Sequence, residues 1–238
     1  PDKIVPGGSV LLEGKKIAAV NVPCPPDARR VDVDGSYIMA GFVDLHVHGG
    51  GDSDFMDEDA SAFPTIAKAH SAHGTTALCP TTMTCADSLL EKTIDLFLEA
   101  DKEPENGAEL LGLHLEGPYF SAASKGAQPI GEQRIPERED LERILRRAKG
   151  SILRWDAAPE LPNMELFAKV MAENGVLTSL AHSAATAPEA LRAFDWGFSH
   201  VTHFYNACTT FHKKNGLVYS GIVEATYLRD DVTIELIG

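Results

Sequence analysis

From residue 37 onward, two kinds of segment alternate along the chain. Short apolar runs that are typical of buried strands are separated by longer stretches of helical character. Strands that alternate with helices pair in parallel, so the pattern predicts an α/β fold with a parallel sheet. The expected strands end near His48, Met83, Pro118, Glu160, Ala184 and Asn206, and a last strand covers 232–237.

Capping signals predict four helices between these strands. Each helix has a capping residue before it, a glycine after it, or both. The expected N-caps are Asp87, Asn163 and Thr186. The predicted helices cover 88–100, 138–149, 164–174 and 187–196.

The number and spacing of the strands suit a TIM-like (β/α)8 barrel, which usually has eight strands and about 250 residues. We therefore predict a barrel domain over 37–238, with its eighth strand expected beyond Gly238. The first 36 residues differ in pattern. Two strand candidates, 9–12 and 16–20, flank a Glu-Gly turn, and 21–34 is rich in proline. Residues 1–36 are expected to be part of a small β-sandwich domain that lacks its first strand.

The net charge of −14 changes the range of expected partners. It disfavours nucleic acid and anionic membranes, and an anionic substrate would need a local basic pocket. No apolar run approaches the roughly 20 residues of a membrane span, and no signal peptide is visible. The four cysteines form no CxxC pair, which indicates reduced thiols in a cytosolic protein.

Polar residues with metal-binding chemistry occur at the ends of four expected strands. In this fold, functional groups lie at the carboxyl ends of the strands. A period of two places His46 and His48 on one face of their strand. Imidazoles and a carboxylate are ligands for Zn²⁺ or a similar metal, and a carboxylate between two pairs of histidines could bridge two ions about 3.5–4 Å apart. The candidate ligands are His46, His48, Glu116, His182 and His203.

Each of these residues also has an ordinary structural explanation, but their joint occurrence favours a metal site. The other polar candidates keep structural explanations. His114 is expected in the core or as support for the site, and His200 is expected to be structural. His70 and His73 lie at a helix end, where cations are favourable. Glu160 fits a supporting partner of the site and a turn stabiliser equally well.

Several motifs carry a family resemblance. They lie at 41–49, 74–81, 114–120, 125–128, 181–186 and 202–207, and include HLEGP and THFYNA. With these motifs the chain resembles the N-acetylglucosamine-6-phosphate deacetylases of the amidohydrolase superfamily, from about Gly8 to Gly238. The resemblance implies that Glu116, His182 and His203 bind one divalent metal. It also implies that His46 and His48 bind a second metal, shared through Glu116.

The resemblance further implies a substrate and an assembly. The substrate would be N-acetylglucosamine 6-phosphate, hydrolysed to glucosamine 6-phosphate and acetate by a cytosolic homodimer. Gln128, Asn206 and the backbone of Ala207 would contact it. The family usually has an arginine shortly afterwards, whereas this chain offers His212 and Lys214, and a lysine lacks bidentate geometry. The sequence does not separate gluco from galacto substrates.

The family's catalytic aspartate is expected beyond Gly238, so no catalytic residue is assigned within 1–238, and the chain as given is expected to be inactive. That aspartate would take a proton from the metal-bound water and deliver it to the leaving amine. Two alternatives stay open. One is an amidohydrolase acting on a different N-acyl or cyclic amide substrate, although such enzymes often bridge their metals with a modified lysine rather than with a residue like Glu116. The other is a non-catalytic metal-binding fragment.

Overall fold

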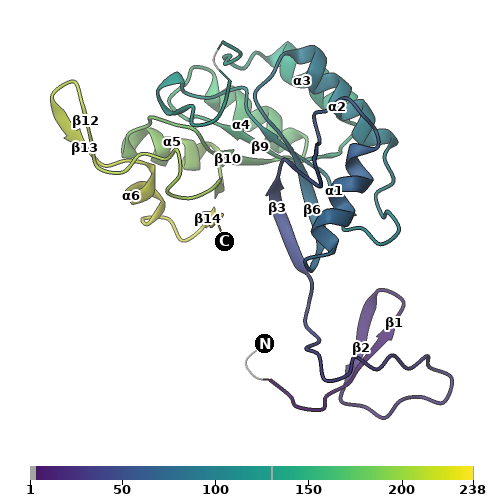
Figure 1. Ribbon diagram of the computed structural model, residues 1–238. Helices are drawn as coiled ribbons and strands as arrows, with labels where there is room; N and C mark the ends of the chain where they lie inside the picture. The colour runs from purple at the N-terminus through teal and green to yellow at the C-terminus, as the bar shows by residue number, and fades with distance from the viewer. Residues whose placement is uncertain (1–3, 130, 238) are drawn as a thin grey trace. The chain divides into compact units, whose positions relative to one another are not determined.

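The computed structural model describes residues 4–129 and 131–237, apart from the side chain of Lys214 (Figure 1). The chain divides into two compact units, Pro1–Gly41 and Phe42–Gly238. In the first unit, β1 (Val10–Glu13) pairs antiparallel with β2 (Lys16–Val20). The two strands predicted there are confirmed, and their assignment to a β-sandwich stays a prediction.

The second unit is built on a curled parallel sheet whose strands follow one another in chain order. Helices cover the outer side of this sheet in Figure 1, which is the arrangement of a TIM-like fold. The short strand β7 (Glu109–Leu110) also pairs with β6. The predicted parallel order is therefore confirmed. The strands are β3 (Phe42–Val47), β6 (Thr75–Thr82), β8 (Leu113–Glu116), β9 (Ile152–Ala157), β10 (Leu177–Leu180), β11 (His200–Val201) and β14 (Thr233–Ile234).

All four predicted helices are confirmed to within about one residue. For α1, only the C-terminal end near His70 and His73 was expected from the sequence, and His70 does lie in its last turn. The shortest helix, α6, was not predicted, because five residues are too few to show a helical pattern. A 3-10 turn, η1 (Ala122–Ser124), lies in the loop after β8. The helices are α1 (Ala62–Ser71), α2 (Asp87–Glu99), α3 (Arg138–Ala148), α4 (Met164–Glu173), α5 (Ala187–Trp196) and α6 (Ile222–Thr226).

The predicted helix caps have mixed outcomes. Thr186 caps α5 in a capping box with Glu189, as expected. Asp87 does not cap α2. It is the first residue of that helix, and its carboxylate forms ion pairs with two arginines instead. Asn163 occupies the N-cap position of α4 without a capping bond, because its side-chain amide donates to the carbonyl of Pro136.

A layer of aromatic side chains fills the space between the sheet and its helices. Burial of one such side chain stabilises the fold by about 1.5–3 kcal/mol, so this layer fixes the strands and therefore their carboxyl ends. The rings of Trp155 and Phe167 lie 5.8 Å apart, centre to centre. The largest fully buried aromatic residues are Trp155, Phe55, Phe63, Phe97, Phe120, Phe167 and Phe198.

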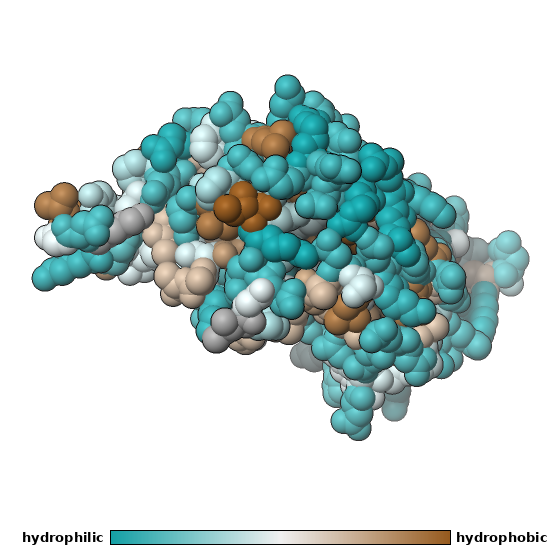
Figure 2. Space-filling view, turned by 90° about the horizontal axis from the view of Figure 1, so that it is seen from above, coloured by the Kyte–Doolittle hydropathy of each residue, from teal (hydrophilic) through white to brown (hydrophobic). Residues whose placement is uncertain are grey.

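Two small hairpins leave the sheet. β4 (Gly49–Gly50) pairs with β5 (Ser53–Asp54), and β12 (His212–Lys214) pairs with β13 (Leu217–Tyr219). The β12–β13 hairpin projects away from the sheet and helices in Figure 1. Figure 2 shows a mostly hydrophilic face with scattered apolar residues. Among the described residues, no helix has the length and apolar character that crossing a membrane requires.

Candidate metal centre

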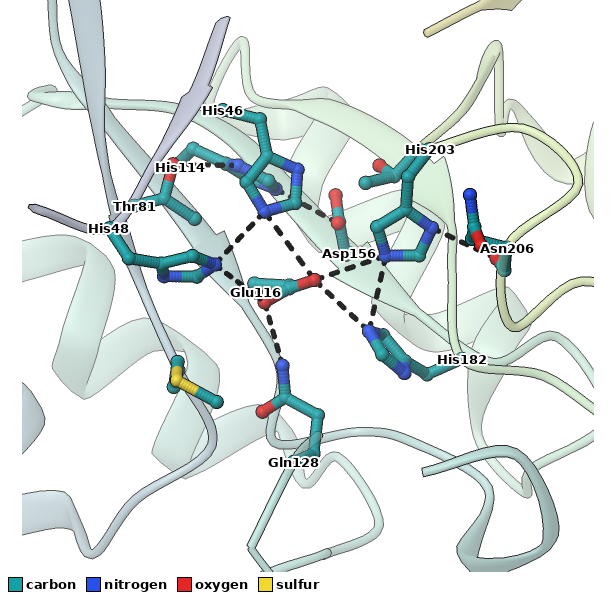
Figure 3. Close-up of polar contacts among 12 residues, drawn as sticks. His46, His48, Thr81, His114, Glu116, Gln128, Asp156, His182, His203 and Asn206 are labelled. Carbon is teal, nitrogen blue, oxygen red and sulfur yellow. Dashed lines mark hydrogen bonds and ion pairs between the residues drawn. The ribbon is translucent and has the colours of Figure 1, made fainter. Parts of the chain in front are cut away.

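Glu116 lies at the centre of four histidine side chains (Figure 3). It is the last residue of β8 and is 3% exposed. His46 comes from β3, and His48 directly follows that strand. His182 follows β10, and His203 follows β11. The carboxyl ends of four parallel strands thus bring together the five residues that the sequence singled out.

One pair of histidines faces the Oε1 atom of Glu116. The Nε2 atoms of His182 and His203 lie 3.0 and 3.1 Å from this oxygen and 3.2 Å from each other. Behind the rings, each Nδ1 lies close to a backbone carbonyl: that of Ser124 at 3.1 Å and that of Asn206 at 3.0 Å. A carbonyl oxygen only accepts hydrogen bonds, so both Nδ1 atoms carry the proton. In the neutral rings, the two Nε2 lone pairs therefore converge on one carboxylate oxygen.

This arrangement fits a bound cation. Two lone pairs and an anionic oxygen repel one another unless a positive charge lies between them. Two nitrogens bound to one tetrahedral zinc ion at about 2.0–2.1 Å lie about 3.3 Å apart. The observed separation of the two Nε2 atoms, 3.2 Å, is close to this value. The donor set of two imidazoles and a carboxylate is also one that zinc and similar metals prefer.

The second pair of histidines repeats the arrangement on the other side of Glu116. The Nε2 atoms of His46 and His48 lie 3.2 Å apart. They lie 3.5 Å from Oε1 and 3.4 Å from Oε2 of Glu116, respectively. The Nδ1 atom of His46 faces the carboxylate of Glu235 at 3.5 Å. Glu116 is thus placed to bridge two cation positions, each with two imidazoles, as the grouping of potential ligand atoms also indicates.

The charges of the cluster are strongly coupled. Burial raises the pKa of Glu116, but the four surrounding imidazoles, which donate hydrogen bonds to it when their Nε2 atoms are protonated, lower the pKa by more. The net pKa is far below its ordinary value, and the carboxyl is ionised. For His46, burial lowers the pKa, whereas Glu116 and Glu235 raise it, and the net result is a pKa of about 10. Protons and metal ions therefore compete for the same nitrogen atoms.

The backbone around the cluster has unusual conformations. His182 and His203 have φ angles of 44° and 34°, in the left-handed region that non-glycine residues rarely adopt. Such strain costs of the order of 1–3 kcal/mol per residue and gathers at functional sites. Gly117, next to Glu116, has φ 100°, and a Cβ atom there would lie 2.3 Å from the hydroxyl oxygen of Thr84. Only glycine fits at this turn, which accounts for the Glu-Gly part of the HLEGP motif.

Comparison with known proteins agrees with this geometry. Residues 37–232 match the amidohydrolase family. The chain belongs to the amidohydrolase family.

Curated relatives of this amidohydrolase are sugar-phosphate deacetylases. It is 29% identical over 215 residues to the N-acetylglucosamine-6-phosphate deacetylase of Lysinibacillus sphaericus, covering 87% of this chain and 54% of that protein. It is 28% identical over 243 residues to the Bacillus subtilis (strain 168) enzyme of the same name, covering 100% and 60%. An N-acetylgalactosamine-6-phosphate deacetylase from Escherichia coli O157:H7 is 29% identical over 192 residues, covering 80% and 51%. The chain therefore spans a little over half the length of these relatives.

Solved structures of the same kind share the fold. The N-acetylglucosamine-6-phosphate deacetylase of Pasteurella multocida superposes with a TM-score of 0.85 at 28% identity, covering 97% of this chain and 60% of that chain. A D267A mutant of the Mycobacterium smegmatis enzyme, in complex with N-acetyl-D-glucosamine-6-phosphate, superposes with a TM-score of 0.84 at 25% identity, covering 96% and 58%. The structural similarity extends over almost the whole chain, so the predicted TIM-like amidohydrolase fold is confirmed.

Gln128, predicted to contact substrate, lies against the candidate metal centre. It is 2% exposed, and its amide nitrogen donates to Oε2 of Glu116 at 2.6 Å (Figure 3). Its amide oxygen accepts from the backbone N–H of Thr84 at 2.8 Å. Both ends of the amide are therefore engaged within the protein, in an arrangement that holds Glu116. Contact with substrate stays a prediction for this residue.

The other predicted substrate residues follow His203 in the chain. The backbone carbonyl of Asn206 accepts from His203, and the Asn206 residue is exposed beside the cluster (Figure 3). Ala207 follows it with φ 49°. His212 begins the projecting β12–β13 hairpin, and its Nδ1 atom bonds the carbonyl of Thr210. The side chain of Lys214 lies outside the described residues. Their roles toward a substrate stay predictions.

A charged network in the interior of the sheet was not predicted from the sequence. Arg154 of β9 is its hub: one of its guanidinium nitrogens lies 2.8 Å from Nδ1 of His114, and another lies 3.1 Å from Nε2 of His200. Asp156, fully buried, lies 2.9 Å from the other nitrogen of His114. Glu235 completes the network, 3.3 Å from Arg154. One signal was available, since Arg154 and Asp156 alternate at a period of two within an apolar strand.

His114, His200 and Glu160 have supporting positions. His114 is buried beneath the cluster, as expected for a residue of the core or a support, and His200 is a buried partner of Arg154. Glu160, for which two explanations were open, accepts hydrogen bonds from the hydroxyl of Ser183 and the N–H of Ala184, both at 2.6 Å. Because these residues directly follow His182, Glu160 stabilises the turn that carries a candidate ligand, which combines the two explanations.

Proposed function

We propose that the protein is a metal-dependent deacetylase that hydrolyses the acetamide group of N-acetylglucosamine 6-phosphate, with glucosamine 6-phosphate and acetate as products. One observation carries the proposal: a buried carboxylate, Glu116, lies between two pairs of imidazoles whose Nε2 atoms face it. The similarity to proteins named as N-acetylglucosamine-6-phosphate deacetylases supplies the substrate class. The proposed ligands are His46, His48, Glu116, His182 and His203.

We propose zinc as the metal, because neutral imidazole and carboxylate suit this ion. A divalent ion in such a site supplies a water of lowered pKa, about 7 instead of 15.7, and polarises the amide carbonyl. The chain's own residues prepare this site. The carbonyls of Ser124 and Asn206 keep the protons of His182 and His203 on Nδ1, and Gln128 orients the carboxylate of Glu116.

The substrate would lie over the cluster, beside the exposed Asn206. Its side-chain amide and the backbone of Ala207 would bind the sugar phosphate, with His212 and Lys214 adding positive charge. We assign no general base among the described residues. Glu116 is a proposed metal ligand, so it is not available as a base. Glu235 faces Nδ1 of His46, on the side of the ring away from the proposed metal positions. The aspartate that the family resemblance implies for this step stays a prediction.

Acetate release tests this function. The protein, in the full length that its gene encodes, is loaded with zinc and assayed with N-acetylglucosamine 6-phosphate, its galacto isomer and unphosphorylated N-acetylglucosamine. We expect kcat/KM to be at least about tenfold higher with phosphate, since a charged hydrogen bond contributes about 1.5–3 kcal/mol. Equal values with and without phosphate would remove phosphate recognition. Zinc binding without release of acetate from any of the three sugars would overturn the deacetylase function.

A cytosolic homodimer is the assembly that we propose with this function. It rests on the resemblance, and the β12–β13 hairpin, which projects from the rest of its unit, is a segment that could reach a second copy. Light scattering after size-exclusion chromatography measures the mass in solution. A monomer at micromolar concentration would contradict the dimer and would leave the proposed chemistry untouched.

A further inference from the structure

The last strand of the sheet ends in an acidic residue that the proposed function does not use. Glu235 directly follows β14, and its side chain is only 13% exposed. A carboxylate is costly to bury unless it is paired and hydrogen-bonded. The partners of Glu235 therefore indicate its role.

Four interactions hold Glu235 in one orientation. Its Oε2 atom accepts a hydrogen bond from the backbone N–H of His203 at 3.3 Å and lies 3.3 Å from the guanidinium of Arg154. Its backbone N–H donates to the carbonyl of Val201 at 3.0 Å, and its carbonyl accepts from the N–H of Phe204 at 2.7 Å. The Oε1 atom is left to face His46.

The contact with His46 determines which ring nitrogen is free. Oε1 of Glu235 lies 3.5 Å from Nδ1 of His46, on the side of the ring that is opposite to Glu116. An ionised carboxylate only accepts hydrogen bonds, so Nδ1 carries the proton when the two groups interact. A neutral His46 then has its lone pair on Nε2, the atom that faces His48 at 3.2 Å.

We propose that Glu235 is a positioning residue of the metal centre. It holds His46 in the tautomer and ring orientation that direct Nε2 toward the cation position shared with His48 and Glu116. The inference rests on the proposed metal binding and extends it to a residue that binds no metal itself. Carboxylate partners behind a ligating histidine typically change metal affinity by 10–100-fold.

Glu235 also connects the two ends of the sheet. β3 and β14 are the first and last strands in the strand order, and among the described residues no backbone ladder joins them. The carboxylate of Glu235 spans this gap, because Glu235 directly follows β14 and contacts His46 of β3. It also accepts a hydrogen bond from the N–H of His203, which follows β11. One side chain thereby sets the spacing between ligands of both cation positions.

Zinc titration of a conservative variant tests the inference. Glu235→Gln keeps the size of the side chain and one oxygen for His203 and Arg154, but it presents an NH₂ group to Nδ1 of His46. This favours the tautomer protonated on Nε2, in which the atom that faces the cation position has no lone pair for the metal. By calorimetry, we expect the weaker zinc dissociation constant to rise 10- to 100-fold. Asp231→Asn is the matched control, because Asp231 is an exposed acid nearby that pairs with Arg229.

Histidine tautomers in the zinc-loaded wild-type protein give a second measurement that needs no folded variant. Two-bond ¹⁵N–¹H correlation spectra should show the proton of His46 on Nδ1. A proton on Nε2 of His46, or unchanged zinc affinity in a folded Glu235→Gln protein, would overturn the role of Glu235 and leave the metal centre in place. Wild-type protein that binds no zinc would overturn the proposed function itself, and the inference with it.

Discussion

Gln128 is the residue whose position adds most to what its sequence context predicts. As a substrate contact, it should affect KM and leave metal binding unchanged. As the hydrogen-bond donor to Glu116, it should affect metal binding even without substrate. The structure favours the second role, because its amide is buried and has protein partners at both ends.

A Gln128→Leu variant separates the two roles. The leucine is similar in size but cannot donate to Glu116, so we expect zinc affinity to fall about 10–100-fold, as for other residues that orient a ligand. Calorimetry with zinc and no substrate is the decisive measurement. The half-buried Gln133, whose amide donates to the carbonyl of Pro129, provides the control Gln133→Leu. A raised KM with unchanged zinc affinity would restore Gln128 to substrate binding alone.

The five candidate ligands could be found from the sequence, because imidazole and carboxylate groups interrupt strands that are otherwise apolar. The residues behind them could not be found in this way. Glu235 meets His46 across 189 positions of the chain, a difference of 235 − 46, and no local pattern links the two. Arg154 likewise gains its role only through partners on other strands.

At the scale of elements, the interior network beneath the candidate metal centre should make folding stability depend on pH. Burial is the main cause that lowers the pKa of His114, from its ordinary value of 6.5 to about 4. Above pH 6.5, His114 is neutral in the folded and unfolded states. As the pH falls from 6.5 to 4, the unfolded state gains a proton that the folded state does not, so stability falls, by about 3 kcal/mol in total for this group.

His114→Asn should remove this part of the pH dependence. Asparagine retains an acceptor for Arg154 but does not titrate, so its free energy of unfolding should change less between pH 7 and pH 4. Urea unfolding at several pH values measures both proteins, and the difference between them isolates His114 from other titrating groups such as His46. Parallel curves for the two proteins would show that His114 does not titrate differently on unfolding.

The capping box of α5 gives a second prediction for an element. Thr186 caps the helix that follows the loop carrying His182, and its hydroxyl and its backbone N–H both donate to the Glu189 carboxylate. Thr186→Ala should lower the free energy of unfolding by about 1 kcal/mol, the typical cost of a lost N-cap. The exposed Thr210 offers Thr210→Ala as a control with little expected effect. Equal denaturation midpoints for the two variants would contradict the capping role.

Elements with clear boundary residues were predicted well. Short elements, and contacts between residues that are distant in sequence, were not. The four long helices follow from their caps and glycines. Helix α6 and the β12–β13 hairpin contain too few residues for a periodic pattern. The predicted cap at Asp87 failed because its carboxylate is taken by arginines from a neighbouring helix and loop, which local sequence does not reveal.

At the scale of the whole molecule, the parallel sheet explains how ligands distant in sequence meet. Strands in chain order bring their carboxyl ends to one side, and Glu116 of β8 lies between the histidines of β3 on one side and those after β10 and β11 on the other. The alternation of strands and helices predicted this arrangement. The left-handed backbone at His182 and His203, which aims both rings at Glu116, was beyond prediction, because tertiary contacts impose it.

Zinc K-edge X-ray absorption of the zinc-loaded protein tests the metal centre most directly. We expect nitrogen and oxygen ligands at about 2.0–2.1 Å, with the scattering of at least two imidazoles per ion. We also expect this shell to be lost in Glu116→Ala and kept in Glu165→Gln, a variant of an exposed acid on α4. Sulfur ligands at about 2.3 Å, a shell without imidazole, or the same spectrum in Glu116→Ala would contradict the proposed metal centre.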